Sequence, residues 1–163
     1  MTEPILNPEY WRKRLIEARK EQIHTSIFRC GYERWLEIEQ VHKRILSEVV
    51  GKDMSILDVG CGYGRLLTLM PRHWKGIYWG VDLSEDFVHL ARQTYPDRDF
   101  FVGEILTFNP TLKFDLAILI SIRPMIIRNL GQEYWDTVES HLRQHVTQIL
   151  YLEYDPEAKG SLE

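Results

Sequence analysis

The fold is decided by the stretch Ile56-Leu57-Asp58-Val59-Gly60-Cys61-Gly62-Tyr63-Gly64-Arg65-Leu66-Leu67. An apolar run ends in an aspartate, three alternating glycines follow, and apolar residues then resume at helical spacing. This order is typical of a strand, a tight glycine loop and a helix. Because glycine has no side chain, such a loop lets a ligand approach the bare backbone. The stretch therefore predicts a ligand-binding turn, with a purely structural strand-to-helix turn as the alternative.

The spacing of the glycines separates this loop from that of dinucleotide-binding proteins. A dinucleotide loop reads G-x-G-x-x-G, and its last glycine allows close packing of the helix on the strand. Here Arg65 stands at that last position, and the glycine comes one residue earlier, at Gly64. The pattern Asp-x-Gly-x-Gly-x-Gly therefore argues against a nicotinamide or flavin site.

Asp58 to Gly64 resembles the first motif of the class I S-adenosylmethionine-dependent methyltransferases. Further along, Asp82, Glu104 and the run from Phe114 to Ser121 stand in the order of that family's next motifs, so the resemblance covers about residues 55–121. It implies S-adenosylmethionine, or its product S-adenosylhomocysteine, as the bound cofactor. The cofactor-binding residues predicted in this way are Asp58, Gly60, Cys61, Gly62, Gly64, Asp82, Leu83, Glu104, Ile105 and Ser121.

Asp82 is also predicted from its position, because it ends an apolar segment 18 residues after Gly64. A carboxylate there can accept both ribose hydroxyls of a nucleoside. The alternative is that Asp82 caps the helix that begins near Ser84. The resemblance implies that Leu83 packs on the adenine face, and that Glu104 replaces the family's usual aspartate at the adenine amino group. An exposed loop acid is the alternative for Glu104.

The resemblance also implies roles at the methionine end of the cofactor. Asp58 and the Gly60 carbonyl would hold the ammonium group, and the backbone of Ser121 would meet the same end. The backbone N–H groups that follow Glu104, beginning at Ile105, would meet the adenine ring nitrogens. Asp115 begins its strand, far from the cofactor, and is expected to be structural.

Strands and helices alternate along the chain, which predicts a doubly wound, mostly parallel α/β sheet of Rossmann-like order 3-2-1-4-5. Residues 1–50 are expected to form N-terminal helices that cap the same domain, and residues 51–163 the cofactor-binding core. The chain ends soon after the fifth strand, where the family usually adds an antiparallel pair, so we expect a C-terminally shortened sheet. The strands are expected at 55–59, 76–82, 99–103, 114–121 and 146–154, and the helices at about 8–27, 32–50, 65–70, 84–95 and 132–145.

Composition excludes several classes of protein. The 163 residues are 44% hydrophobic and 27% charged, which is ordinary for one globular domain. A net charge of −4 provides no basic field for nucleic acid, so nucleic acid is not expected as a partner. The sequence shows no apolar run of membrane-spanning length, no signal peptide and no metal-binding cluster of cysteine and histidine. We expect a cytoplasmic protein without a metal site.

The acceptor pocket can be located but not identified from the sequence. The helix from Tyr32 must begin near the carboxyl ends of the strands, so Tyr32 and Arg34 are expected beside the cofactor. Arg123, in an expected loop over 123–128, would approach from the other side. The first helix, with Tyr10 and Trp11, would close the site as a lid. Simple packing is the alternative for each of these side chains.

Two functions remain in competition. The first is a methyltransferase acting on a small molecule, with no catalytic residue assigned, because transfer of an activated methyl group depends mainly on positioning. The second is a non-catalytic S-adenosylmethionine-binding module or a subunit of a larger complex. The fifth strand is expected to be an exposed edge or to be covered, either by the N-terminal helix or by a second copy in a homodimer.

Overall fold

The computed structural model describes residues 7–18 and 32–153. A five-stranded sheet of order β3-β2-β1-β4-β5 forms its centre, and every neighbouring pair of strands is parallel. The strands are β1 (Ile56–Val59), β2 (Tyr78–Asp82), β3 (Asp99–Val102), β4 (Phe114–Ile120) and β5 (Val146–Leu152). The predicted order 3-2-1-4-5 is confirmed.

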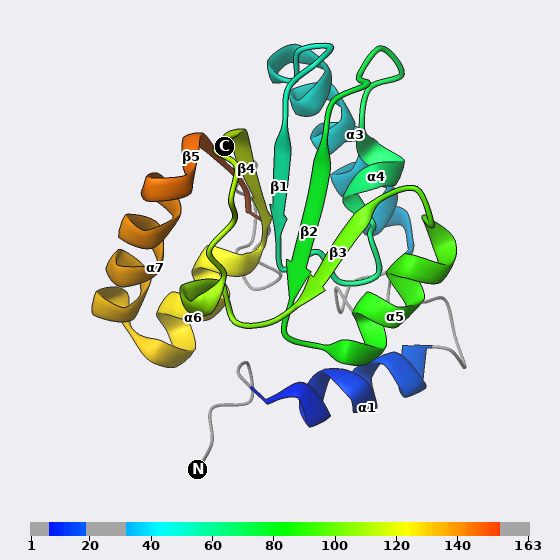
Figure 1. Cartoon of the computed structure of the whole chain (residues 1–163). Coiled ribbons are helices and arrows are strands. Elements are labelled where there is room, and N and C mark those ends of the chain that lie inside the picture. Colours follow the sequence, from blue (N-terminus) through cyan, green and yellow to red (C-terminus); the bar gives the residue numbers. More distant parts are fainter. Residues whose placement is uncertain (1–6, 19–31, 154–163) are drawn as a thin grey trace.

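Helices cover both faces of the sheet, as expected for a doubly wound fold. Figure 1 shows α3, α4 and α5 on one side of the sheet and α6 and α7 on the other. Each side has its own buried apolar cluster, one containing Leu46 and Val88, the other containing Trp135 and Val138. The described helices are α1 (Pro8–Ala18), α3 (Tyr32–Val49), α4 (Leu66–Leu69), α5 (Glu85–Thr94), the short 3₁₀ helix η2 (Ile105–Thr107), α6 (Ile122–Leu130) and α7 (Gln132–His145).

The segment after β4 corrects one prediction. The expected loop over 123–128 is the helix α6. Pro124 lies in its first turn, where the backbone N–H has no partner within the helix, so proline is tolerated there. The helix ends at Leu130 and is followed by its cap, Gly131, which has φ +89° and ψ +166°. The predicted ends of the first helix, near residue 27, and of the fifth strand, at residue 154, lie outside the described residues.

The starts of β1 and β4 are tied together by side chains. The backbone N–H and the hydroxyl of Ser55 both donate to Asp115 Oδ2, at 2.8 Å each. These hydrogen bonds lower the pKa of the Asp115 carboxyl. Asp115 is therefore structural, as predicted. The pairing Val59↔Leu119 carries this register to the carboxyl ends of both strands, so the glycine loop and Ser121 emerge at the same edge.

The helix α1 crosses the edge of the sheet at which the strands end, alongside α5 (Figure 1). Trp11 lies against Phe87, with ring centroids 6.4 Å apart, and Arg12 Nε is 3.7 Å from Asp86 Oδ2. Leu15 is buried. Among the described helices, none is both long enough and apolar enough to span a lipid bilayer.

Candidate functional site

The glycine loop is anchored to the end of β2 by its backbone. The N–H groups of Gly60 and Cys61 both donate to the carbonyl of Val81, at 2.8 and 3.1 Å. The N–H of Gly64 donates to the Cys61 carbonyl at 2.9 Å, which closes the turn. These hydrogen bonds fix the loop beyond the carboxyl end of β1.

Two of the glycines have similar backbones but different surroundings. Gly60 and Gly62 have φ angles of +72° and +53°, in the left-handed region that favours glycine. A Cβ on Gly60 would lie 2.4 Å from Ile122 Cδ1, whereas a Cβ on Gly62 would meet nothing within 4 Å. Gly60 is therefore packed against α6, while the backbone of Gly62 faces open space that a ligand can enter.

Asp82 joins the loop to the next helix. Its Oδ2 accepts a hydrogen bond from the Gly62 N–H and its Oδ1 accepts one from the Ser84 N–H, both at 2.8 Å. Burial raises the pKa of the Asp82 carboxyl, and these two hydrogen bonds act in the opposite direction. An ionised carboxylate offers about four acceptor positions, so two remain for a ligand. The cap of α5 is Ser84, whose hydroxyl accepts from the Phe87 N–H at 3.4 Å.

Asp58 lies beneath the loop and is 2% exposed. The hydroxyl of Tyr78 donates to its Oδ2 at 2.7 Å. Burial raises the pKa of Asp58 to about 7, the Tyr78 hydrogen bond and Arg65 lower it, and Asp82 raises it. The carboxyl group therefore changes its charge near neutral pH.

Cys61 contributes its backbone to the loop, and its side chain is buried. Burial raises the pKa of the Cys61 thiol, so the sulfur stays protonated and packs as a small apolar group. A Cβ on Gly80 would lie 2.9 Å from Cys61 Sγ, so glycine on β2 makes room for this side chain.

Glu104 has a partner that sequence reasoning missed. The hydroxyl of Tyr134, in the first turn of α7, donates to Glu104 Oε1 at 2.5 Å. Burial, together with Glu104, raises the pKa of Tyr134 to about 12, so the hydroxyl remains a donor. Glu104 precedes η2, and both Ile105 and Leu83 are half-buried. The sequence predicts the helix over 132–145 that carries Tyr134, but no pattern in it relates Tyr134 to Glu104.

Ser121 has an unusual backbone. Its φ of +57° is the only positive value at a non-glycine position among residues 7–18 and 32–153. Its N–H donates to the Leu152 carbonyl at 3.0 Å, and α6 begins at the next residue. Left-handed backbone at such a residue costs of order 1–3 kcal/mol and is concentrated at functional sites.

The residues predicted for the acceptor lie on helices of different faces. Tyr32 is 52% exposed at the start of α3 and stacks on Trp35, with centroids 5.8 Å apart. Arg34 donates from Nη1 to Glu37 Oε2 at 2.9 Å. Arg123, on α6, donates to Glu153 and lies 4.8 Å from the centroid of the Tyr151 ring. Its guanidinium is thus held toward β5, on the side of β4 away from β1.

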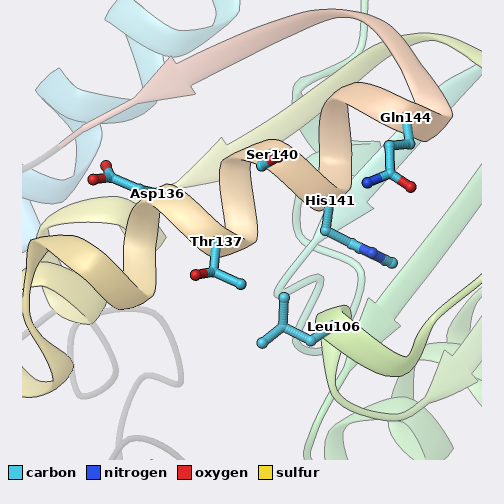
Figure 2. A pocket seen from close by; sticks show the side chains of 6 residues that line it. All are labelled: Leu106, Asp136, Thr137, Ser140, His141 and Gln144. Carbon is cyan, nitrogen blue, oxygen red and sulfur yellow. The ribbon is translucent and has the colours of Figure 1, made fainter.

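A surface hollow of about 610 Å³ lies elsewhere, between η2 and α7 (Figure 2). Its lining contains none of the predicted cofactor residues, and it is formed by Leu106, Asp136, Thr137, Ser140, His141 and Gln144. His141 Nε2 lies 2.9 Å from the Phe108 carbonyl, so this ring is engaged by the backbone. Within the described part of the chain, no group of three or more acidic, histidine or cysteine side chains is arranged to hold a metal ion.

Comparison with known sequences gives a consistent assignment. A family model described as a methyltransferase domain matches residues 56–145, more than half of the chain. A trans-aconitate 2-methyltransferase of Afipia carboxidovorans is 26% identical over 106 residues, which cover 61% of this chain and 41% of that protein. This chain spans between 33% and 41% of the length of the curated relatives that it matches.

Solved structures show the same fold. An S-adenosylmethionine-dependent methyltransferase from Clostridium acetobutylicum has a TM-score of 0.59 at 20% identity, covering 83% of this chain and 56% of that chain. The magnesium protoporphyrin IX methyltransferase of Synechocystis, crystallised with S-adenosylmethionine, has a TM-score of 0.56 at 18% identity, covering 71% of this chain and 56% of that chain. Because the family match includes the glycine loop, Asp82, Glu104 and Ser121, the chain belongs to the class I S-adenosylmethionine-dependent methyltransferases.

Proposed function

We propose that this chain binds S-adenosylmethionine at the carboxyl edge of the sheet, beside the glycine loop, and transfers its methyl group to a small molecule. The observation that carries the proposal is the open space beside Gly62, next to a carboxylate that already accepts the Gly62 N–H. A ligand with two adjacent hydroxyls matches the acceptor positions that remain on Asp82.

The residues present fit the parts of this cofactor. Asp82 would accept the ribose hydroxyls, and Leu83, half-buried beside it, would cover one face of the adenine. Glu104, oriented by the Tyr134 hydroxyl, would accept the adenine amino group. Asp58 would carry the negative charge that faces the methionine ammonium, and Ser121 would present its backbone to the same end.

The chemistry needs little from the side chains. The cofactor supplies a methyl group that is already activated by its bond to a sulfonium sulfur. This chain's residues hold the two reactants in line and exclude water, and such positioning is worth about 7–11 kcal/mol in favourable cases. A general base is required only for an acceptor that must lose a proton.

The acceptor that we propose is a small anionic or aromatic molecule. One relative is named for trans-aconitate, which is a small carboxylate anion. Tyr32 and Arg34, at the start of α3, offer an exposed aromatic ring and a guanidinium group. Arg123 can take part only if its guanidinium leaves Glu153 and Tyr151.

Replacing Asp82 by alanine tests the cofactor site. We expect the dissociation constant for S-adenosylmethionine to rise at least about tenfold, because the ribose hydroxyls lose their acceptor. Isothermal titration calorimetry measures this constant, and the exposed Asp97→Ala variant is the control. Since Asp82 also holds the Gly62 N–H, thermal melting of each variant is followed in parallel. An unchanged constant in Asp82→Ala rejects the ribose assignment.

Turnover separates an enzyme from a binding module. The chain is incubated with cofactor labelled in its methyl group and with a cell metabolite extract, and products are separated by mass. Label in a small product supports a methyltransferase of small molecules. Tight binding without transfer, across extracts from several growth conditions, supports the non-catalytic module. No binding at millimolar cofactor contradicts both.

A further inference from the structure

The glycine loop is tied to α3 by a buried ion pair. Arg65 Nε lies 3.2 Å from Glu39 Oε1, and the two side chains are only 6% and 10% exposed. Lys43, one turn further along α3, places its Nζ 3.6 Å from the other oxygen of Glu39. Charged side chains of this kind are almost never so buried unless they are paired.

Arg65 lies where the glycine loop meets α4, so the ion pair acts on the loop. Arg65 directly follows Gly64 and directly precedes α4, so its side chain anchors the end of the loop. Its positive charge also acts on Asp58, whose pKa it lowers. One guanidinium therefore links α3, the loop and the acidic group beneath the loop.

Stability alone does not explain the pair. Removing two charges from water costs several kcal/mol per ion, and apolar residues of similar volume are often as stable or more stable in the same place. A buried ion pair depends on orientation and apolar packing does not, because the guanidinium and the carboxylate form hydrogen bonds only in certain orientations. The pair therefore fixes how the loop lies against α3.

We propose that Arg65 and Glu39 are positioning residues for the cofactor, holding the glycine loop against α3 in its binding geometry. This inference rests on the proposed function of the loop. Neither side chain is assigned a contact with the cofactor or with the reacting atoms.

The first test replaces both charges by apolar side chains, in Glu39→Leu/Arg65→Met. We expect the melting temperature to stay within a few degrees of the wild type, because no unpaired charge is left buried. The dissociation constant for S-adenosylmethionine should nevertheless rise about tenfold or more. The ion pair of α7, whose side chains are 27% and 60% exposed, is changed in Glu139→Leu/Arg143→Met as the control. This change should leave the constant unchanged.

The second readout is the pH dependence of cofactor affinity. The ammonium group binds the ionised form of Asp58, so affinity should rise with pH through the pKa of this carboxyl, about 7. Tyr78, Asp82, Cys61 and Arg65 are the titratable or charged groups that face it. Without Arg65 the pKa of Asp58 is higher, so the rise should move to higher pH. Arg65→Lys keeps the charge and should keep the wild-type midpoint.

The outcomes separate this inference from the function on which it rests. Absence of binding by the wild type at millimolar cofactor contradicts the proposed function. A double variant that melts, binds and titrates like the wild type overturns the positioning role alone. Where the double variant does not fold, Glu39→Gln keeps the volume and removes the charge. Weaker binding by Glu39→Gln then supports the role, and wild-type binding by this variant overturns it.

Discussion

Gly60 and Gly62 are two residues apart, and a side chain at each would meet different surroundings. Both lie in the left-handed region, which costs an ordinary residue roughly 1–2 kcal/mol. Only Gly60 has a neighbour where a side chain would begin, namely Ile122 of α6. Gly60 therefore allows the loop to pack against α6, and Gly62 leaves space for a ligand to approach the backbone.

Alanine at each position tests this division. Gly60→Ala should lower the free energy of unfolding by about 3 kcal/mol or more, because strain is added to a clash with Ile122. Gly62→Ala should lower it by only about 1–2 kcal/mol, yet weaken S-adenosylmethionine binding at least about tenfold, because its Cβ enters the ligand space. Urea unfolding and calorimetry measure the two effects. Equal losses of stability with unchanged cofactor affinity in Gly62→Ala would contradict the assignment.

Sequence reasoning at the residue scale succeeded where a pattern was local. The alternating glycines are visible along the chain, and Asp82 was predicted at the strand end from which it reaches Gly62. The partner of Glu104 is 30 residues away and that of Arg65 is 26 residues away. Pairs at such separations leave no periodic signal, so Arg65 could be used only to exclude a dinucleotide site.

The helix α1 lies alongside α5, beyond the carboxyl ends of the strands (Figure 1). Trp11 and Arg12 join it to the first turn of α5, and Phe87 also lies 6.2 Å from the ring of Tyr63 in the glycine loop. We propose that α1 acts as a lid, because Phe87 lies against both Trp11 of α1 and Tyr63 of the glycine loop.

Trp11→Ala should loosen α1 while leaving the sheet intact. An aromatic contact of this kind is worth about 0.5–1.5 kcal/mol beyond its buried area, so amides of α1 and of the first turn of α5 should exchange roughly tenfold faster. Hydrogen exchange measured by mass spectrometry checks this, with amides of α7 as the internal reference. Ile16→Ala, at a half-exposed position of the same helix, is the matched control. Equal protection of α1 in Trp11→Ala and wild type would argue against the contact.

Element prediction failed at one instructive place. Ser121-Ile122-Arg123-Pro124 reads as a loop because proline ends most helical patterns. The same proline is harmless in a first turn, and whether a turn starts there depends on Ser121, which adopts a left-handed backbone after β4. A single residue's conformation at the end of a strand is set by tertiary contacts, so it was not available to pattern reasoning.

Buried ionisable groups make the stability of the whole molecule depend on pH. His42 is 4% exposed on α3, and burial, together with Arg65, lowers its pKa from 6.5 to about 4. The unfolded chain then binds more protons between these values, so His42 destabilises the fold as pH falls from 6.5 to 4. Asp58 has the opposite effect, because its raised pKa of about 7 makes the folded chain bind the extra proton.

His42→Gln isolates one of these two effects. Between pH 7 and pH 4.5 the wild type should lose about 2–3 kcal/mol more unfolding free energy than the variant, since each pKa unit is worth 1.36 kcal/mol. Urea unfolding at the two pH values measures the difference. His89→Gln, at an exposed position of α5, is the control. Parallel pH profiles for the wild type and His42→Gln would show that His42 does not titrate as its burial implies.

At the scale of the whole molecule, the alternation of apolar strands with helices was sufficient to predict the sheet order. Handedness and parallel pairing leave few arrangements for such an alternation, and the observed β3-β2-β1-β4-β5 is one of them. The acceptor could not be predicted in the same way. The side chains predicted for its binding lie on helices of both faces, and no spacing along the chain relates Tyr32 to Arg123.

The central position of β1 has a consequence for how the chain acquires its structure. One neighbour, β2, follows about twenty residues later, but the other, β4, is joined to it by contacts such as Ser55–Asp115, across 60 residues. Parallel pairings over such distances close slowly. During synthesis on the ribosome, β1, which leads into the glycine loop, therefore stays unpaired on one side until β4 has been made. The unpaired side of β1 is the part of the chain at which aggregation is expected to begin when folding is interrupted.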